Sequence, residues 1–130
     1  MEYTENARLT VKTTAGGVLP VVGAVVRIRG SDEENRFVEY SLLTDIDGLT
    51  PAILLPTPKR EASLSPRAVE APYSSYDVEI IKSGFYTKRL VGMAMFSGID
   101  AILPIDMIPL GEGEPNTTLN IMLTQNEMLE

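Results

Sequence analysis

Alternation of apolar and polar residues is the strongest local signal along this chain. Apolar side chains occupy every second position in the segments 8–12, 24–29 and 76–80. Successive side chains of a β-strand point to opposite faces, so this period of two predicts three strands that each bury one face. In the second of them the other face carries Arg27 and Arg29, which we expect in solvent.

Turn residues mark where the predicted strands end. Asp45-Ile46-Asp47-Gly48 separates an aromatic and aliphatic segment, 37–44, from a short apolar segment, 52–55. Glycine adopts positive φ at little cost, so an Asp-Gly pair between two apolar segments predicts a reversal of the chain. A second turn at Ser83-Gly84 connects the strand at 76–80 to a returning strand over 86–91.

The remaining segments are less regular. The segment 102–108 has β character but contains Pro104, which predicts an edge strand or a bulge. Residues 56–73 form a long, proline-rich connection, and connections of this length in a compact domain are usually functional or mobile. Residues 111–115 have the composition of a hinge, and alternation over 119–123 is compatible with an additional strand.

These segments together predict an all-β fold, namely an antiparallel β-sandwich of about seven strands with Greek-key connections. A chain of 130 residues is long enough for one domain with its own core. We expect residues 1–110 to form the sandwich and residues 111–130 to form a hinge and a C-terminal extension.

Two residue types that carry much of enzyme chemistry are absent. The chain has no cysteine and no histidine, which excludes disulfides, thiolate zinc sites, cysteine nucleophiles and a Ser-His-Asp triad. We predict no catalytic residue, no metal, no cofactor and no enzymatic activity. A glycosidase that uses only carboxylates is the remaining enzymatic alternative, because the chain has 18 acidic residues.

The charge of the chain restricts its partners. A net charge of −7 at pH 7 argues against nucleic acid and anionic membranes, because an acidic surface is repelled by both. No apolar run has the length of a transmembrane helix. Acidic residues stand near the start, where a signal peptide would be basic, so the pattern predicts no signal peptide and disfavours secretion by the usual route.

The order of the motifs resembles the carboxypeptidase regulatory-like domain, a transthyretin-like (prealbumin-like) β-sandwich. The matching pieces lie within residues 7–110 and are Ala24-x-Val26-x-Ile28, Thr44-Asp45-x-Asp47-Gly48, Tyr76-x-Val78-x-Ile80 and Gly84-Phe85.

A second set of pieces is similar to the accessory domain of clostridial spore cortex-lytic enzymes. These pieces are Leu55-Pro56-x-Pro58, Ser63-Leu64-Ser65-Pro66 and Pro72-Tyr73-Ser74-x-Tyr76. This resemblance implies a non-catalytic module that accompanies a cell-wall lytic enzyme. Together with the expected lack of a signal peptide, it implies a cytoplasmic or spore-associated location.

Two groups of residues are candidates for an interaction surface. The first is a small basic group in the proline-rich connection, together with the tyrosine that follows it: Lys59, Arg60, Arg67 and Tyr73. The second is an apolar group, which marks a protein interface if exposed and fills the core otherwise: Met93, Met95 and Phe96. We expect a protein or peptidoglycan partner at these surfaces.

Two alternatives remain. An oligomer forms if an exposed edge strand, or the segment 119–123, pairs with a neighbouring subunit. Asp45 and Asp47 can also begin a calcium loop, but the twelfth position of that loop is Pro56 where a glutamate is needed, so we favour the turn.

Overall fold

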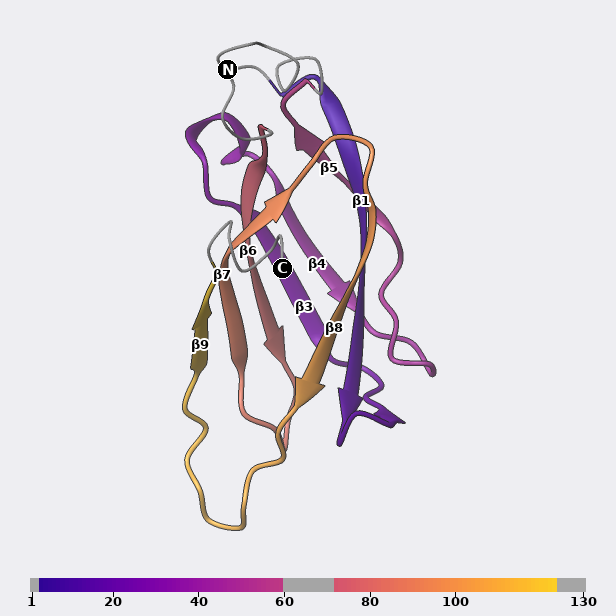
Figure 1. Ribbon diagram of the computed structural model, residues 1–130. Helices are drawn as coiled ribbons and strands as arrows, with labels where there is room; N and C mark the ends of the chain where they lie inside the picture. Colours follow the sequence, from indigo (N-terminus) through magenta and orange to yellow (C-terminus); the bar gives the residue numbers. More distant parts are fainter. Residues whose placement is uncertain (1–2, 60–71, 124–130) are drawn as a thin grey trace.

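Strands account for nearly all of the regular structure in the computed structural model, which describes residues 3–59 and 72–123 (Figure 1). The strands are β1 (Glu5–Ala15), β2 (Leu19–Pro20), β3 (Val25–Gly30), β4 (Glu39–Leu43), β5 (Ile53–Thr57), β6 (Ser74–Ile81), β7 (Lys88–Met95), β8 (Asp100–Met107) and β9 (Leu119–Met122). A single 3₁₀ turn, η1 (Glu33–Asn35), lies between β3 and β4 in the described part of the chain. The predicted all-β fold is confirmed.

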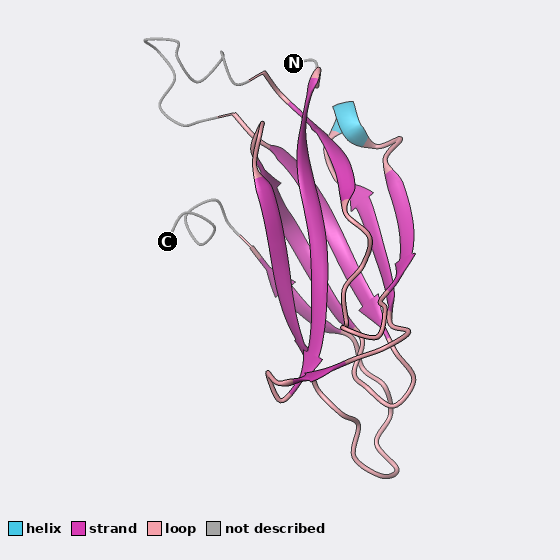
Figure 2. Cartoon of the chain, turned by 90° about the vertical axis from the view of Figure 1, so that its right-hand side faces the viewer, coloured by secondary structure: helices cyan, strands magenta, loops and turns pink. Residues whose placement is uncertain are grey.

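The strands form two sheets that face each other as a sandwich (Figure 2). One sheet has the order β2-β1-β5 with β8 also paired to β1, and the other has the order β4-β3-β6-β7-β9. Most neighbours are antiparallel, as predicted, but β8 runs parallel to β1 and β9 runs parallel to β7. Both of these strands arrive from the opposite sheet (Figure 1), so no hairpin sets their direction.

The alternating segments bury the side chains that the pattern selects. Those at most 1% exposed include Leu9, Val11, Val26, Ile28, Tyr76, Val78 and Ile80. Full burial of one aliphatic side chain contributes about 1.5–3 kcal/mol, so this interior is the main source of stability. The polar positions between them are left on the outer faces of the two sheets.

The turn after β4 has the predicted Asp-Gly form. The Asp45 carboxylate accepts hydrogen bonds from the amides of Asp47 (2.9 Å) and Leu49 (3.0 Å). Gly48 has a φ of 77°, and a Cβ on it would lie 2.4 Å from the carbonyl oxygen of Thr13. Backbone conformation and the close approach of β1 therefore both require glycine at this position.

Buried threonine hydroxyls connect this turn to the strands around it. The Thr44 hydroxyl donates to the Val21 carbonyl (2.7 Å) and accepts from the Ala24 amide (2.9 Å). The Thr13 hydroxyl also donates to the Val21 carbonyl, at 2.9 Å. These bonds satisfy backbone groups that the irregular segment 21–24 leaves without a strand partner.

Tyrosine hydroxyls link the two sheets at β5. Tyr40 of β4 donates to the carbonyl of Leu54 (2.9 Å), and Tyr76 of β6 donates to the carbonyl of Pro56 (2.7 Å). Burial is the largest cause of a raised pKa for Tyr76, so its hydroxyl stays protonated and remains a donor. Pro56 has no amide proton, and these two carbonyls are occupied, so the open edge of β5 offers few groups to another strand.

The last described strand is held onto β7 at both ends. The Asn116 side chain accepts from the Thr87 amide (3.0 Å), and the Leu119 amide donates to the Thr87 carbonyl (2.8 Å). At the other end the Leu123 amide donates to the Val91 carbonyl, also at 2.8 Å. Residues 119–122 therefore belong to the five-stranded sheet.

Within the described residues, no helix has the length and apolarity that a membrane span requires. The same residues contain no group of three or more carboxylate side chains placed to hold a metal ion.

Replacing Gly48 with alanine should destabilise the sandwich strongly. Positive φ costs a non-glycine residue about 1–3 kcal/mol, and the added Cβ must also displace the backbone of β1. We expect a lower midpoint of urea unfolding, measured by circular dichroism. Gly16→Ala is the matched control, because Gly16 has a φ of 63° but a Cβ there meets nothing within 4 Å. Equal losses in the two variants would contradict the close contact with Thr13.

Thr57 allows a test in the opposite direction. Its hydroxyl is fully buried and is, in the described part of the chain, the one such side-chain group without a hydrogen-bond partner. Thr57→Val removes this unsatisfied group, so we expect the free energy of unfolding to stay the same or rise by about 1 kcal/mol. Thr44→Val removes a hydroxyl with two partners and should cost about 1–3 kcal/mol. Urea unfolding of both variants measures the contrast, and a similar loss in Thr57→Val would show that its hydroxyl has a partner.

Candidate functional site

The outer face of the five-stranded sheet carries rows of opposite charges. Arg27 and Arg29 of β3 lie opposite Glu79 and Asp77 of β6. Arg89 of β7 lies opposite Glu79 from the other side. Neighbouring strands are about 4.8 Å apart, so the two carboxylates of β6 lie between cationic side chains of both neighbours.

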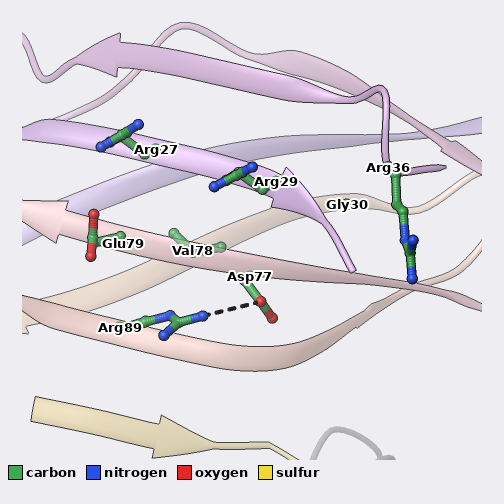
Figure 3. Close-up of a pocket in the computed structure, with 8 residues that line it drawn as sticks. All are labelled: Arg27, Arg29, Gly30, Arg36, Asp77, Val78, Glu79 and Arg89. Carbon is green, nitrogen blue, oxygen red and sulfur yellow. Dashed lines mark ion pairs between the residues drawn. The ribbon is translucent and has the colours of Figure 1, made fainter. Parts of the chain in front are cut away.

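This charged face is hollowed (Figure 3). The hollow has a volume of about 590 Å³ and is lined by Arg27, Arg29, Gly30, Arg36, Asp77, Val78, Glu79 and Arg89. Its side chains come from three hydrogen-bonded strands and from the residue after η1, so most of them stand on a rigid support.

Arg36 is placed in the hollow by the partly buried segment 32–35 that precedes it, called the corner below. The corner is built on Asn35, which has no exposed surface and donates from its side-chain amide to the carbonyl of Ser75 (3.0 Å). The Asp32 carboxylate accepts from the amide of Ser75 at 2.7 Å. Because the corner is tied to the start of β6, Arg36 extends toward β6 beside the end of β3 (Figure 3).

Some of the charged side chains in and beside the hollow form two ion pairs with each other. Arg27 pairs with Glu39 of β4 at 3.8 Å, and Arg89 pairs with Asp77 at 3.7 Å. All four side chains are partly exposed, with 24% exposure for Asp77 and about half for the other three. Asp77 also accepts from the amide of Gly92 (3.1 Å). Exposed pairs of this length contribute little to stability, so these contacts mainly orient the side chains.

Three charged groups of the hollow have no ion pair among the described residues. They are Arg29, Arg36 and Glu79. The lining as a whole has four arginines and two carboxylates, and is therefore net positive, whereas the chain carries −7. Arginine presents a planar fork of N–H donors that matches carboxylates in a bidentate manner. The arrangement is suited to bind an anionic ligand.

The basic group expected in the proline-rich connection lies mostly outside the described residues. Arg60 and Arg67 both fall there. Lys59 is exposed at the end of β5, and Tyr73 is 36% exposed just before β6. The Tyr73 ring lies against Phe96, with ring centroids 5.8 Å apart and planes tilted by 48°.

The apolar group at the end of β7 is divided by the fold. Met93 and Met95 point into the sandwich and are 1% and 3% exposed, so they pack in the core. Phe96, which follows them, is half-buried against Tyr73. Of the residues expected at a surface, Lys59, Tyr73 and part of Phe96 are the ones that the described structure leaves accessible.

Arg36 and Arg89 were missed by the sequence analysis, although Arg27 and Arg29 were correctly expected in solvent. Alternation indicates which side chains face outward, but it does not give the order of the strands. The cross-strand register, which brings Arg27, Glu79 and Arg89 into one row, appears only in the folded sheet.

A second hollow lies between the sheets on the side of β4 and β5. It has a volume of about 430 Å³ and is lined by Asn6, Phe37, Val38, Glu39, Tyr40, Leu54 and Pro56. Phe37 is 78% exposed and Leu54 is 51% exposed, so this hollow is more apolar than the arginine-lined one.

The backbone of β4 borders this second hollow with an open edge. The Thr44 amide donates to the Ala24 carbonyl and the Gly30 amide donates to the Val38 carbonyl, so even-numbered residues face β3. Backbone groups alternate along an antiparallel strand, so those of Glu39, Ser41 and Leu43 point away from β3. β4 ends the strand order of its sheet, and these groups have no strand partner in the described structure.

No family model matches this chain, and no curated protein matches its sequence. Among solved structures, the Bacillus anthracis TIE protein is similar with a TM-score of 0.53 and 14% identity over 82% of this chain, which spans only 17% of that protein. A Bacteroides uniformis protein named for a suspected role in carbohydrate binding has a TM-score of 0.48 and 13% identity over 79% of this chain and 41% of that one.

A third similar structure is 3-chlorocatechol 1,2-dioxygenase from Rhodococcus opacus, with a TM-score of 0.46 and 12% identity over 73% of this chain and 45% of the enzyme. The TIE protein supports the β-sandwich fold, and at this identity it supports the fold alone. At TM-scores below 0.5 the other two similarities carry no functional inference.

Proposed function

We propose that this chain is a non-catalytic binding or positioning module whose binding face is the arginine-lined hollow. Its ligand is a carboxylate-bearing polymer of the cell wall, and the module works in a spore- or envelope-associated lytic system. The observation that carries the proposal is the net positive hollow on the outer face of a sheet in an otherwise acidic protein.

The contrast in charge gives the hollow its selectivity. Most of the surface of a chain with 18 acidic and 11 basic residues repels anions. Four arginines gathered in one hollow attract them locally, and two of the four lack an ion pair within the described residues. An anionic ligand is thereby directed to one face of the sandwich.

The lining residues suit binding better than catalysis. The titratable side chains of the hollow are arginines and two carboxylates, and neither Asp77 nor Glu79 is enclosed. Arginine stays protonated at physiological pH and does not act as a base. The four arginines therefore suit the hollow to recognise a ligand by its charge.

The envelope setting is supported by the sequence motifs. The pieces around Pro56, Ser63 and Pro72 are similar to those of a domain that accompanies cortex-lytic enzymes. Peptidoglycan carries carboxylates on its peptide stems, which makes it a chemically matched ligand for arginine.

Co-sedimentation with purified peptidoglycan sacculi tests this proposal. The wild-type chain should sediment with sacculi at low salt and be released in about 0.5 M salt, because partly exposed charges are screened. Arg29→Ala with Arg36→Ala should weaken binding at least about tenfold, if each lost contact is worth roughly 1 kcal/mol. The matched control is Arg8→Ala with Lys12→Ala, which removes two exposed cations from the outer face of β1. Wild-type protein that stays in the supernatant would refute the proposal.

An assembly module is the second candidate function, and the open edge of β4 favours it. In the described structure the outward amides and carbonyls of β4 have no strand partner and lie beside exposed Phe37 and Leu54, and these are the features that recruit an added strand. Such a strand would come from another subunit and would extend the five-stranded sheet.

Ser41→Pro tests the assembly function. The Ser41 amide points away from β3, so proline there removes an edge donor without removing a bond within the sheet. If β4 mediates assembly, multi-angle light scattering should show an oligomer for the wild type and a monomer for Ser41→Pro, with Ser41→Ala behaving like the wild type. A wild-type monomer at high protein concentration would reject this function.

A further inference from the structure

We infer that the arginine-lined hollow recognises a zwitterionic peptide, in which a primary ammonium group at one end is followed by two carboxylates. This inference rests on the proposed function, because it names the chemical unit that the same hollow would hold. It follows from which charges of the hollow are already paired and which are left for a ligand.

The paired charges are found at the sides of the hollow. Arg27 is drawn toward Glu39 and Arg89 toward Asp77. Both arginines lie opposite Glu79 in the strand register, yet neither forms an ion pair with it. Glu79 therefore lies between two cations that are already used elsewhere.

The unpaired charged groups of the hollow indicate which charges a ligand should carry. Among the described residues, Arg29 and Arg36 have no carboxylate partner and Glu79 has no cationic partner. A purely anionic ligand would satisfy the two arginines but would place negative charge beside Glu79. A ligand with two carboxylates and one ammonium satisfies all three groups.

The spacing of Arg29 and Glu79 fits an extended peptide, and Arg36 lies beyond Arg29, past the end of β3 (Figure 3). Arg29 and Glu79 stand on neighbouring strands two positions apart in register, a diagonal of about 7–8 Å between backbones. Side chains of one face recur about 6.8 Å apart along an extended chain, from twice the rise per residue. Acidic and ammonium-bearing residues of one extended peptide can therefore reach Arg29 and Glu79 together.

The exposure of the hollow to solvent limits the affinity that it can have for a peptide. Each contact is partly in solvent, so binding should be weak, salt-dependent and dominated by charge pattern. The loss of binding free energy from removing one charge of the ligand should therefore depend on whether the opposing charge of the protein is present, as in a double-mutant cycle.

Fluorescence anisotropy of three short peptides, each labelled at its N-terminus and titrated with the wild-type chain, tests the inference. The probes are amidated Lys-Gly-Glu-Gly-Glu with a fluorophore on the N-terminal amine, the same labelled peptide with norleucine in place of lysine, and the charge-reversed Glu-Gly-Lys-Gly-Lys with the same label. We expect the first to bind the wild type at least about fivefold more tightly than the norleucine peptide, and the third to bind most weakly.

Variants of the chain assign the contacts. Glu79→Gln should abolish the preference for lysine over norleucine while leaving the affinity for the norleucine peptide unchanged or higher. Arg29→Ala should weaken both acidic peptides and preserve the preference between them. Circular dichroism of each variant controls for folding, and Lys12→Ala is the control for loss of charge on the opposite sheet. A lysine preference that survives in Glu79→Gln, or equal binding of the first two peptides by the wild type, would overturn the inference.

The peptide and sacculus experiments separate the two proposals. Wild-type binding to sacculi without discrimination among the peptides would refute the zwitterionic ligand and leave the proposed function standing. Selective binding of the lysine peptide without binding to sacculi would support the ligand chemistry and refute the cell-wall function, and would point to an acidic, lysine-containing protein segment as the partner.

Discussion

The backbone pairing of β6 with β3 on one side and β7 on the other is the constraint on which the rest of this structure depends. Because side chains alternate along each strand, the same pairing places Val78 and Ile80 in the core and Asp77 and Glu79 outside. Any shift of one residue would bury carboxylates and expose the core, so the apolar interior holds the charged face in register.

The charged face is a compromise between stability and recognition. Arginines of β3 and β7 would repel each other if β6 carried neutral residues, and the carboxylates of β6 reduce that repulsion. The compensation is incomplete, because Arg29 and Arg36 lack ion pairs in the described structure. Functional surfaces often keep such unsatisfied groups, since a ligand can satisfy them. The edge strands of the two sheets also differ. Tyrosine hydroxyls and Pro56 protect β5, whereas within the described residues β4 keeps backbone groups without a strand partner beside exposed apolar side chains.

The sequence by itself determined the elements with a local cause. Alternation at 24–29 and 76–80 identifies strands and their buried faces, and Asp47-Gly48 identifies a turn whose conformation only glycine adopts freely. The absence of cysteine and histidine excludes disulfides, thiolate zinc sites, cysteine nucleophiles and a Ser-His-Asp triad from composition alone. These inferences hold because each depends on a few neighbouring residues or on a simple count.

Tertiary structure decided the features that depend on residues far apart in the chain. The parallel pairings of β8 with β1 and of β9 with β7 arise from crossings between sheets, which leave no local signature. Met93 and Met95 could have faced a partner or the core, and the bulged pairing of β6 with β7 turns them inward. Arg36 and Arg89 join Arg27 and Arg29 in one hollow through the register of three strands and through the hydrogen bonds of Asn35 and Asp32 to Ser75. The sequence alone does not specify these contacts, because they connect residues that are far apart in the chain.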